Sequence, residues 1–170
     1  MVETATFPAA PVYDDQSIRK VLEMVKDPEI PVLTIEDMGI VRQIEFGQES
    51  IQISIMPTYS GCPAMDVIAE DVKSMLVLHG YKNIEVKTVL SPAWSSDFIS
   101  ENGRKCLEEY GIAPPASAGS KAAMIGIDAV ACPQCKSIKT KVVSEFGSTA
   151  CKALYKCEDC LEPFDYFKCV

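Results

Sequence analysis

Histidine is nearly absent from this chain, which contains one, His79, among 170 residues. It precedes Gly80 at the expected end of a helix, where an imidazole interacts with the helix dipole rather than serving in a catalytic triad. No apolar run approaches the roughly 20 residues that span a bilayer. The N-terminus also lacks the basic and apolar segments of a secretory signal. We therefore expect a cytoplasmic protein that makes no contact with a membrane.

Positive charge is also scarce, and the formal net charge is −8. Residues 1–120 carry 9 Lys and Arg against 18 Asp and Glu, whereas residues 121–170 carry 7 against 6. Binding to a phosphate backbone requires clustered cations, and neither part of the chain has a basic run. We expect no nucleic-acid partner, while a protein partner remains compatible with an acidic surface.

Cysteine, in contrast, is plentiful, with eight in the chain and six of them after residue 130. Cys132 and Cys135 form one C-x-x-C knuckle, Cys157 and Cys160 form another, and 21 residues separate the two. In a reducing cytosol such spacing indicates metal binding more often than disulfides. Four thiolates around Zn²⁺ form a closed structural site. Iron in place of zinc stays open.

The two remaining cysteines of the tail are Cys151 and Cys169, and their spacing does not decide whether either is a ligand. Three short strands are expected near the knuckles, over 138–143, 153–155 and 162–167. Together they predict a zinc ribbon, because so small a domain would be marginal without a metal.

The loop 56–64 joins an alternating strand over 51–56 to a helix with an apolar stripe that ends at Gly80. Pro63 suits the first position of that helix, which places Cys62 at its start. Free N–H groups and the positive end of the dipole predict a lowered pKa and a substantial thiolate fraction for Cys62. A thiolate is a nucleophile and a metal ligand. The alternative is a small residue that fills a tight turn.

The remaining N-terminal residues predict two further helices, a hairpin and another strand. In chain order we expect a helix from Asp14 or Asp15, strands over 40–46 and 51–56, the helix after Cys62, a strand over 84–90, and a helix that starts at Ser95 or Ser96 and stops at Gly111. This order is typical of an α+β domain with a small mixed or antiparallel sheet. Asp37 ends a proline-rich loop, where its ordinary role is to form a turn.

Composition divides the chain into four segments. They are a flexible arm over 1–13, the α+β domain over 14–112, a linker over 113–123 and a four-cysteine zinc-ribbon-like domain over 124–170. The linker is assigned from its run of small residues, Pro, Gly and Ser.

Four motifs resemble those of the MIP18 (DUF59) family and follow that family's order. They are Asp-Pro-Glu at 27–29, Asp-Met-Gly-Ile-Val at 37–41, Thr58 with Gly-Cys-Pro at 61–63, and Ser-Pro-Ala-Trp at 91–94. The tail motifs, at 132–135, 144–151, 154–157 and 162–169, resemble those of the PaaD family of phenylacetate catabolism. The resemblance implies an iron–sulfur-assembly-like α+β domain followed by a small β zinc ribbon.

The resemblance also implies a function. It is that of a bacterial cytosolic factor, not an enzyme, that matures the metal or iron–sulfur centres of phenylacetyl-CoA epoxidase, a di-iron multicomponent monooxygenase. Its partners would be the epoxidase subunits or their iron–sulfur reductase as client, and the iron–sulfur assembly machinery. Carried over by position, Cys62 would handle iron or a transient iron–sulfur cluster, with Asp37 and Thr58 as further cofactor-binding residues.

One thiolate cannot hold a cluster alone. A second subunit in a homodimer, an external thiol or the client would have to supply the other ligands. Two other functions fit the same residues. A non-catalytic adaptor subunit would bind through its acidic body and the aromatic residues Phe164, Tyr166 and Phe167, with structural zinc in the tail. An electron carrier would hold iron at the C-terminal cysteines.

Overall fold

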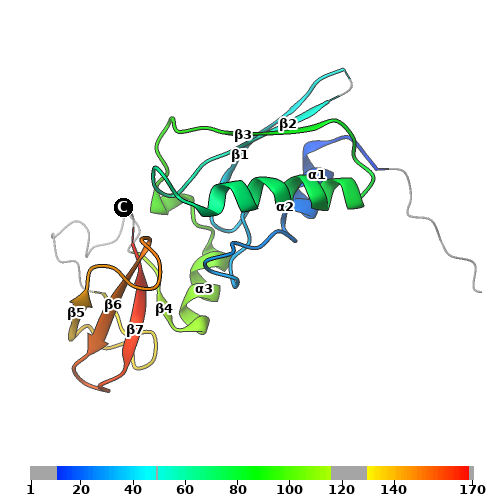
Figure 1. The fold of residues 1–170 in the computed structure, drawn as a ribbon. Helices are drawn as coiled ribbons and strands as arrows, with labels where there is room; N and C mark the ends of the chain where they lie inside the picture. Colours follow the sequence, from blue (N-terminus) through cyan, green and yellow to red (C-terminus); the bar gives the residue numbers. More distant parts are fainter. Residues whose placement is uncertain (1–10, 49, 116–129, 169–170) are drawn as a thin grey trace, which may run out of the picture.

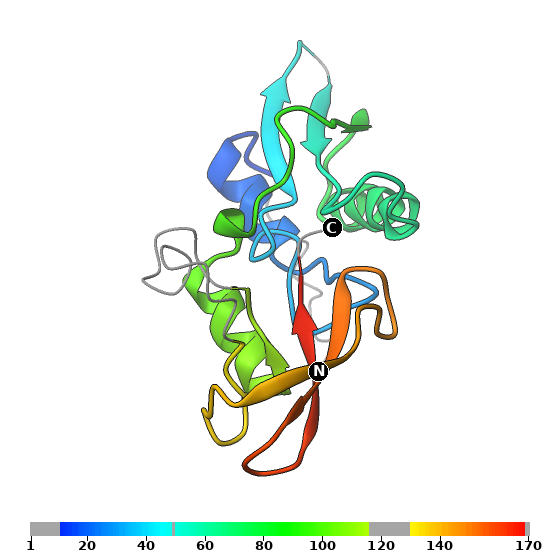
Figure 2. The same ribbon diagram turned by 90° about the vertical axis from the view of Figure 1, so that its left-hand side faces the viewer.

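The computed structural model describes residues 11–48, 50–115 and 130–168, which form two modules in contact with each other (Figure 1). The tip of the first hairpin and the C-terminal ribbon lie at opposite ends of the molecule (Figure 2). None of the described helices has the length and apolar character of a membrane span.

The N-terminal module contains one sheet and its helices. Its elements are α1 (Asp15–Leu22), β1 (Val41–Phe46), β2 (Ile51–Ile55), α2 (Ala64–Leu78), β3 (Ile84–Thr88), the 3₁₀ helix η1 (Ser96–Phe98) and α3 (Glu101–Tyr110). The strand order is β1-β2-β3, with β1 antiparallel to β2 and β2 parallel to β3. The predicted α+β class is confirmed, and the sheet is the mixed one of the two alternatives.

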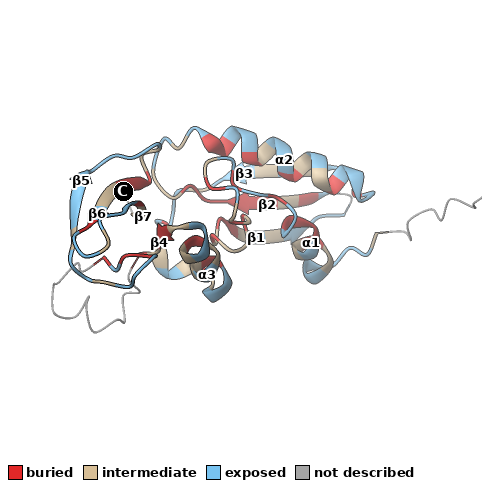
Figure 3. Ribbon diagram, turned by 90° about the horizontal axis from the view of Figure 1, so that it is seen from below, coloured by how far each residue is buried: buried red, intermediate tan, exposed pale blue. Residues whose placement is uncertain are grey.

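The core of this module forms where α2 packs along β3 and contacts α1. The central strand β2 buries its isoleucines, and α2 turns one apolar stripe inward. The buried residues of these two elements include Ile51, Ile53, Ile55, Ile68, Val72 and Leu76. Each fully buried aliphatic side chain stabilises the fold by about 1.5–3 kcal/mol. In Figure 3 the central strand is buried, whereas β5 at the edge of the ribbon is exposed.

The C-terminal module is a four-stranded sheet. Its strands are β4 (Ile112–Ala113), β5 (Thr140–Ser144), β6 (Lys152–Cys157) and β7 (Pro163–Phe167), in the order β4-β7-β6-β5. The last three pair antiparallel, in agreement with the three predicted strands, and β4 pairs parallel to β7. The sheet of the ribbon therefore includes the two residues that follow Gly111, the C-terminal cap of α3.

This pairing corrects the predicted edge of the linker. Ala113 is a paired strand residue and is buried, so the segment over 113–123 does not begin as a linker. The part from 116 to 129 lies outside the described residues. The predicted arm over 1–13 also ends earlier, because the hydroxyl of Tyr81 donates to the backbone oxygen of Val12 at 3.0 Å and its ring contacts Tyr13 edge-on. Residues 1–10 are not described.

The third helix starts later than predicted. Ser95 caps only the 3₁₀ turn η1, and α3 begins after Ser100, whose hydroxyl oxygen accepts a hydrogen bond from the N–H of Gly103 at 2.8 Å. The N–H of Ser100 itself donates to the backbone oxygen of Asp37 at 2.8 Å. This tertiary contact holds the chain out of helix at that point. The predicted stop at Gly111 is confirmed, with φ of +91°.

Residues of the ribbon contribute to the hydrophobic core of the N-terminal module. Phe167 is completely buried in the N-terminal cluster, and its ring meets Trp94 edge-to-face at a centroid distance of 5.9 Å. The indole N–H of Trp94 donates to the backbone oxygen of Met38 at 3.0 Å, which confirms that this side chain covers one end of the core with its polar group satisfied. The last strand of the ribbon therefore completes the first module.

We expect Phe167→Ala to lower the free energy of unfolding by about 3–5 kcal/mol, because it empties the junction between the modules. Chemical denaturation followed by Trp94 fluorescence measures this loss. The matched control is Phe146→Ala, since Phe146 is exposed and its ring lies 4.1 Å from the Lys168 ammonium; it should cost under about 1 kcal/mol. Equal losses for both variants would show that the junction is not a shared core.

Candidate functional site

The four knuckle cysteines converge in the ribbon. The sulfur atoms of Cys132, Cys135, Cys157 and Cys160 all lie within 4.8 Å of one another. Two of the separations are 3.7 Å, between Cys132 and Cys160, and 3.5 Å, between Cys135 and Cys157. A tetrahedral zinc with Zn–S bonds of about 2.3 Å has S···S edges of about 3.8 Å. The donor set and its spacing fit such an ion.

The two knuckles share the same backbone hydrogen bonding. The N–H of Cys132 donates to the oxygen of Ser137 at 2.9 Å, and the N–H of Cys157 donates to the oxygen of Glu162 at 3.0 Å. Each bond spans five residues and closes the turn that carries one pair of thiols. The ribbon therefore presents two equivalent turns whose side chains face each other.

Near the end of each turn one residue adopts the left-handed conformation: Lys136, with φ of +63°, and Leu161, with φ of +67°. In the second knuckle, backbone N–H groups lie close to a sulfur. The N–H of Cys160 lies 3.5 Å from the sulfur of Cys157, and together with the N–H of Asp159 it lowers the pKa of Cys157. Hydrogen bonds from backbone amides favour the thiolate, which is the form that binds metal.

The Cys62 loop has the predicted strand–loop–helix geometry. Gly61 adopts φ of +87°, and the N–H of Cys62 donates to the oxygen of Tyr59 at 3.3 Å to close the turn. Pro63 is the N-terminal cap residue of α2 and not, as predicted, its first helical residue, and its side chain supplies no cap. The half-buried Cys62 thiol therefore lies one residue before the cap, packed against the core of the first module.

The predicted lowering of the Cys62 pKa is wrong. Burial raises the pKa of this thiol, and the charges of Glu29 and Asp27 raise it further. The N–H of Ala64 and the hydroxyl of Tyr59 donate to the sulfur and act in the opposite direction, without offsetting burial. The prediction counted the N–H groups of the helix start and not the desolvation. In the free protein Cys62 is a neutral thiol at pH 7.

Asp37 lies in a network at the start of α3. Its carboxylate accepts hydrogen bonds from the hydroxyls of Thr34 at 2.9 Å and Ser100 at 2.6 Å, and from the amide of Asn102 at 3.2 and 3.3 Å. Burial opposes its ionisation, but these donors prevail and lower the pKa of Asp37. These partners agree with the turn-forming role, and its cofactor-binding role stays a prediction.

Thr58 lies on the Cys62 loop. It lines a hollow of about 230 Å³ between that loop and the segment that carries Leu90, Ala93 and Trp94. The Ser-Pro-Ala-Trp motif therefore faces the Cys62 loop across this hollow, although the two are distant in sequence. A cofactor-binding role for Thr58 remains a prediction.

The Asp-Pro-Glu motif forms a tight turn beside Cys62. The buried carboxylate of Asp27 accepts hydrogen bonds from the N–H groups of Glu29 at 2.8 Å and Ile30 at 2.7 Å. Burial nevertheless raises the pKa of Asp27. The turn places the half-buried Glu29 between the Cys62 loop and the ribbon.

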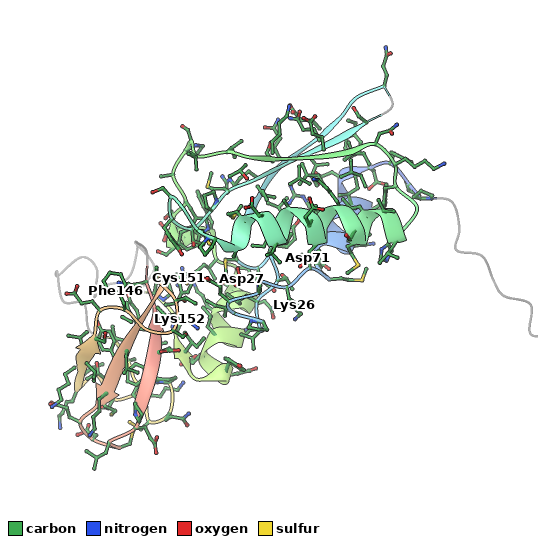
Figure 4. The ribbon with its side chains drawn as sticks, in the orientation of Figure 1. Lys26, Asp27, Asp71, Phe146, Cys151 and Lys152 are labelled. Carbon is green, nitrogen blue, oxygen red and sulfur yellow. The ribbon has the colours of Figure 1, made fainter. Side chains whose placement is uncertain are left out.

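The ribbon supplies two buried residues to the same region. The sulfur of Cys151, which is 4% exposed, lies 3.6 Å from a carboxylate oxygen of Glu29 and 3.0 Å from the hydroxyl of Thr149. The ammonium of Lys152, whose residue is 7% exposed, lies 3.5 Å from the backbone oxygen of Glu29 and 3.9 Å from Asp165. Figure 4 shows Cys151 and Lys152 at the junction near Asp27.

No pattern in the sequence assigns a role at this junction to Glu29, Tyr59 or Lys152, and the spacing of the cysteines does not decide the role of Cys151. Their positions depend on how the ribbon packs, which no local pattern encodes. The one available signal was that the Asp-Pro-Glu motif and the motif ending in Cys151 both belong to family patterns. Cys169, the other undecided cysteine, lies outside the described residues.

Comparison with known proteins agrees with both modules. Residues 15–88 match the model of an iron-sulfur cluster assembly protein family, and residues 116–168 match the PaaD zinc beta ribbon domain. A protein of Escherichia coli (strain K12), provisionally assigned as a component of 1,2-phenylacetyl-CoA epoxidase, is 46% identical over 149 residues, covering 88% of this chain and 89% of that protein. The chain belongs to the PaaD family. The zinc beta ribbon match of this PaaD-family chain lies in its C-terminal module.

Other relatives match about half of the chain. A Fe-S protein maturation auxiliary factor of Porphyromonas gingivalis (strain ATCC BAA-308 / W83) is 32% identical over 89 residues, covering 51% of this chain and 84% of that protein. The crystal structure of a DUF59 domain from Bacillus anthracis superposes with a TM-score of 0.52 at 29% identity, over 55% of this chain and 90% of that one. The predicted resemblance and fold are confirmed.

We expect about one zinc per chain in the wild type and in Cys106→Ser, and much less in Cys157→Ser, since Cys157 is one of four converging thiols. Cys106 is a suitable control because it is a free cysteine on α3 that packs against the first core. Atomic absorption on purified protein measures the metal, and a chelator should lower the thermal stability of the wild type. Full zinc retention in Cys157→Ser would contradict the assignment.

We expect Asp37→Asn to destabilise the protein by about 1 kcal/mol at pH 7, since it removes a charged acceptor of three side-chain donors. The pKa of Asp37 is lower in the folded than in the unfolded state, so this contribution is complete above the unfolded pKa and disappears as the pH falls through the folded one. Denaturation at pH 7 and pH 3 tests the trend.

The control for this series is Asp71→Asn, because Asp71 is an exposed residue of α2. Its stability should follow that of the wild type at both pH values. A difference between Asp37→Asn and the wild type that persists undiminished at pH 3 would contradict the role of the Asp37 charge.

Proposed function

We propose that this PaaD-family protein is a cytoplasmic accessory factor that matures the metal or iron–sulfur centres of phenylacetyl-CoA epoxidase, and that it does not itself turn over the CoA ester. The observation that carries this proposal is a half-buried thiol, Cys62, at a strand–loop–helix turn of an iron–sulfur-assembly-type module. The names of the relatives support both halves of the statement, one as an epoxidase component and the other as a Fe-S maturation factor.

In this function Cys62 would be the ligand that takes up the cargo, iron or an iron–sulfur cluster. The thiol loses its proton to solvent as the sulfur binds, since the thiolate is the metal ligand. Tyr59, in hydrogen-bonding contact with Cys62, would hold the side chain in place. Thr58 and Asp37 would shape the loop and its surroundings.

A single sulfur ligand leaves most coordination positions of the iron or iron–sulfur cluster open. We propose that the client supplies the ligands that complete its own centre, which gives the transfer a direction. The epoxidase subunits or their iron–sulfur reductase are the clients that this scheme requires, with the iron–sulfur assembly machinery as donor.

The ribbon would stabilise the protein and provide a docking surface. Its four cysteines would hold a structural zinc, which stabilises a small sheet that has little apolar core of its own. Among the described residues β5 is the edge strand of the ribbon sheet, and its Val142 and Val143 are exposed, so this edge would be a docking surface for a protein partner. Docking of the client at the ribbon would bring it to the molecule that carries Cys62.

The test is epoxidase activity after co-production with Cys62→Ser, which we expect to fall by at least about tenfold while zinc content and thermal stability of the factor stay unchanged. Loss of an essential metal ligand has at least the effect of losing a residue that only orients one. Cys106→Ser, which alters a cysteine of α3, should support full activity. Full activity with Cys62→Ser would overturn the proposal and favour an adaptor subunit.

Metal content distinguishes the proposed maturation factor from the remaining alternative, an electron carrier. Protein purified without oxygen should contain about one zinc per chain, with iron and acid-labile sulfide that are substoichiometric and lost in Cys62→Ser. Stoichiometric iron that is retained in Cys62→Ser and lost in Cys157→Ser would instead identify an electron carrier that uses the ribbon cysteines.

A further inference from the structure

Two cysteines from different modules lie around the same carboxylate and the same phenol. Glu29 and Tyr59 each lie within electrostatic range of both Cys62 and Cys151. Cys62 belongs to the loop before α2, and Cys151 directly precedes β6 of the ribbon. The ribbon therefore brings a second thiol, Cys151, into the surroundings of Cys62.

The Cys151 side of this cluster is defined by close contacts. Its sulfur lies 3.6 Å from the Glu29 carboxylate and 3.0 Å from the hydroxyl of Thr149. The backbone oxygen of Cys151 accepts a hydrogen bond from the N–H of Lys168 at 2.9 Å, which ties the residue to the end of β7. Cys151 is thus held at the junction by the same strand that buries Phe167 in the first core.

The Cys62 side is more open. Cys62, Tyr59 and Glu29 are each partly exposed, whereas Cys151 is buried behind them. A cation approaching from solvent would meet Cys62 and Glu29 first and reach Cys151 last. The cluster therefore has an accessible side and a buried side.

We propose that Cys62, Cys151 and Glu29 form a second metal-binding site, in which the ribbon contributes a thiol to the cation that Cys62 binds. Two thiols and one carboxylate suit a thiophilic divalent cation such as ferrous iron, whether alone or within a cluster. Each thiol releases one proton to solvent as its sulfur binds. Three protein ligands leave a fourth tetrahedral position open, as in sites that exchange what they hold.

The charges around the cluster favour a cation. Asp27 and Glu29 are the nearby carboxylates, and Lys152 is the cation that faces them from the ribbon, also close to Asp165. Its ammonium lies nearest to the backbone oxygen of Glu29 and not to the carboxylate contacted by Cys151. The Glu29 carboxylate lies 3.6 Å from the Cys151 sulfur, and its charge also acts on Cys62.

The site differs from that in the ribbon in how far it is preassembled. Among the described residues, the ribbon cysteines are the group of ligands that already converges within 4.8 Å. Cys62, Cys151 and Glu29 are arranged more loosely around Tyr59, so binding would have to draw them together. A permanently held zinc in one site and an exchangeable cation in the other follow from this difference.

This inference rests on the proposed function for the identity of the cargo, but binding can be measured without a client. Full-length protein, first loaded with one zinc per chain, is titrated with Co²⁺ in the absence of oxygen. The ribbon keeps its zinc because zinc binds such sites more tightly than cobalt. Absorption from thiolate-to-cobalt charge transfer then reports thiol ligands at the second site, and released zinc is measured in parallel.

We expect wild type and Cys106→Ala to bind cobalt alike. Cys62→Ser and Cys151→Ala should each lower the charge-transfer absorption by about half and weaken cobalt binding at least about tenfold. Since Cys151 is packed in the core, Glu29→Gln provides a second test at a partly exposed residue, and it should weaken binding without reducing the absorption per bound cobalt. Zinc content and thermal unfolding confirm that each variant is folded.

Cobalt binding to Cys151→Ala that equals the wild type, or a wild type without thiolate absorption, would overturn the second site. If Cys62→Ser binds cobalt like the wild type but no longer supports epoxidase activation, the second site is overturned and the proposed function stands. If Cys62→Ser loses cobalt binding but still supports activation, the second site stands and the proposed function is overturned. Loading with Fe²⁺ in the presence and absence of sulfide, followed by assay of iron and acid-labile sulfide, distinguishes a lone iron from a cluster.

Discussion

The contact between Phe167 and Trp94 determines how the whole molecule is arranged. Phe167 is the last residue of the ribbon sheet, and its burial in the first core brings the start of β6 against the Asp-Pro-Glu turn. Burying an aromatic side chain of this size is among the larger single contributions to a fold. The pairing of β4 with β7 and the contacts of Cys151 and Lys152 with Glu29 join the same two modules.

Hydrogen-bonded carboxylates give the loops around that contact their shape. Asp27 holds its turn through two backbone N–H groups, and Asp37 joins its loop to the start of α3 through Thr34, Ser100 and Asn102. Both acids are part of the fold first. Because each one is paired with donors, neither leaves a buried charge uncompensated.

Two kinds of cysteine environment follow from this architecture. In the ribbon, backbone N–H groups surround Cys157 and favour its thiolate, which suits a metal that stays bound. At the junction, burial and the neighbouring carboxylates keep Cys62 and Cys151 protonated in the free protein, and burial raises the pKa of Cys151 to about 11. A permanent site and an exchangeable one can therefore exist in the same chain.

Local signals in the amino-acid sequence were enough to specify some of these elements. The C-x-x-C spacing identified the ribbon cysteines, and Gly61, Pro63 and the apolar stripe placed Cys62 at the start of α2, because turns and helix ends depend on a few adjacent residues. Tertiary packing set the pKa of Cys62, the pairing of β4 with β7, and the place of Cys151 beside Glu29. Each depends on desolvation or packing between segments distant in the chain, for which no local pattern exists.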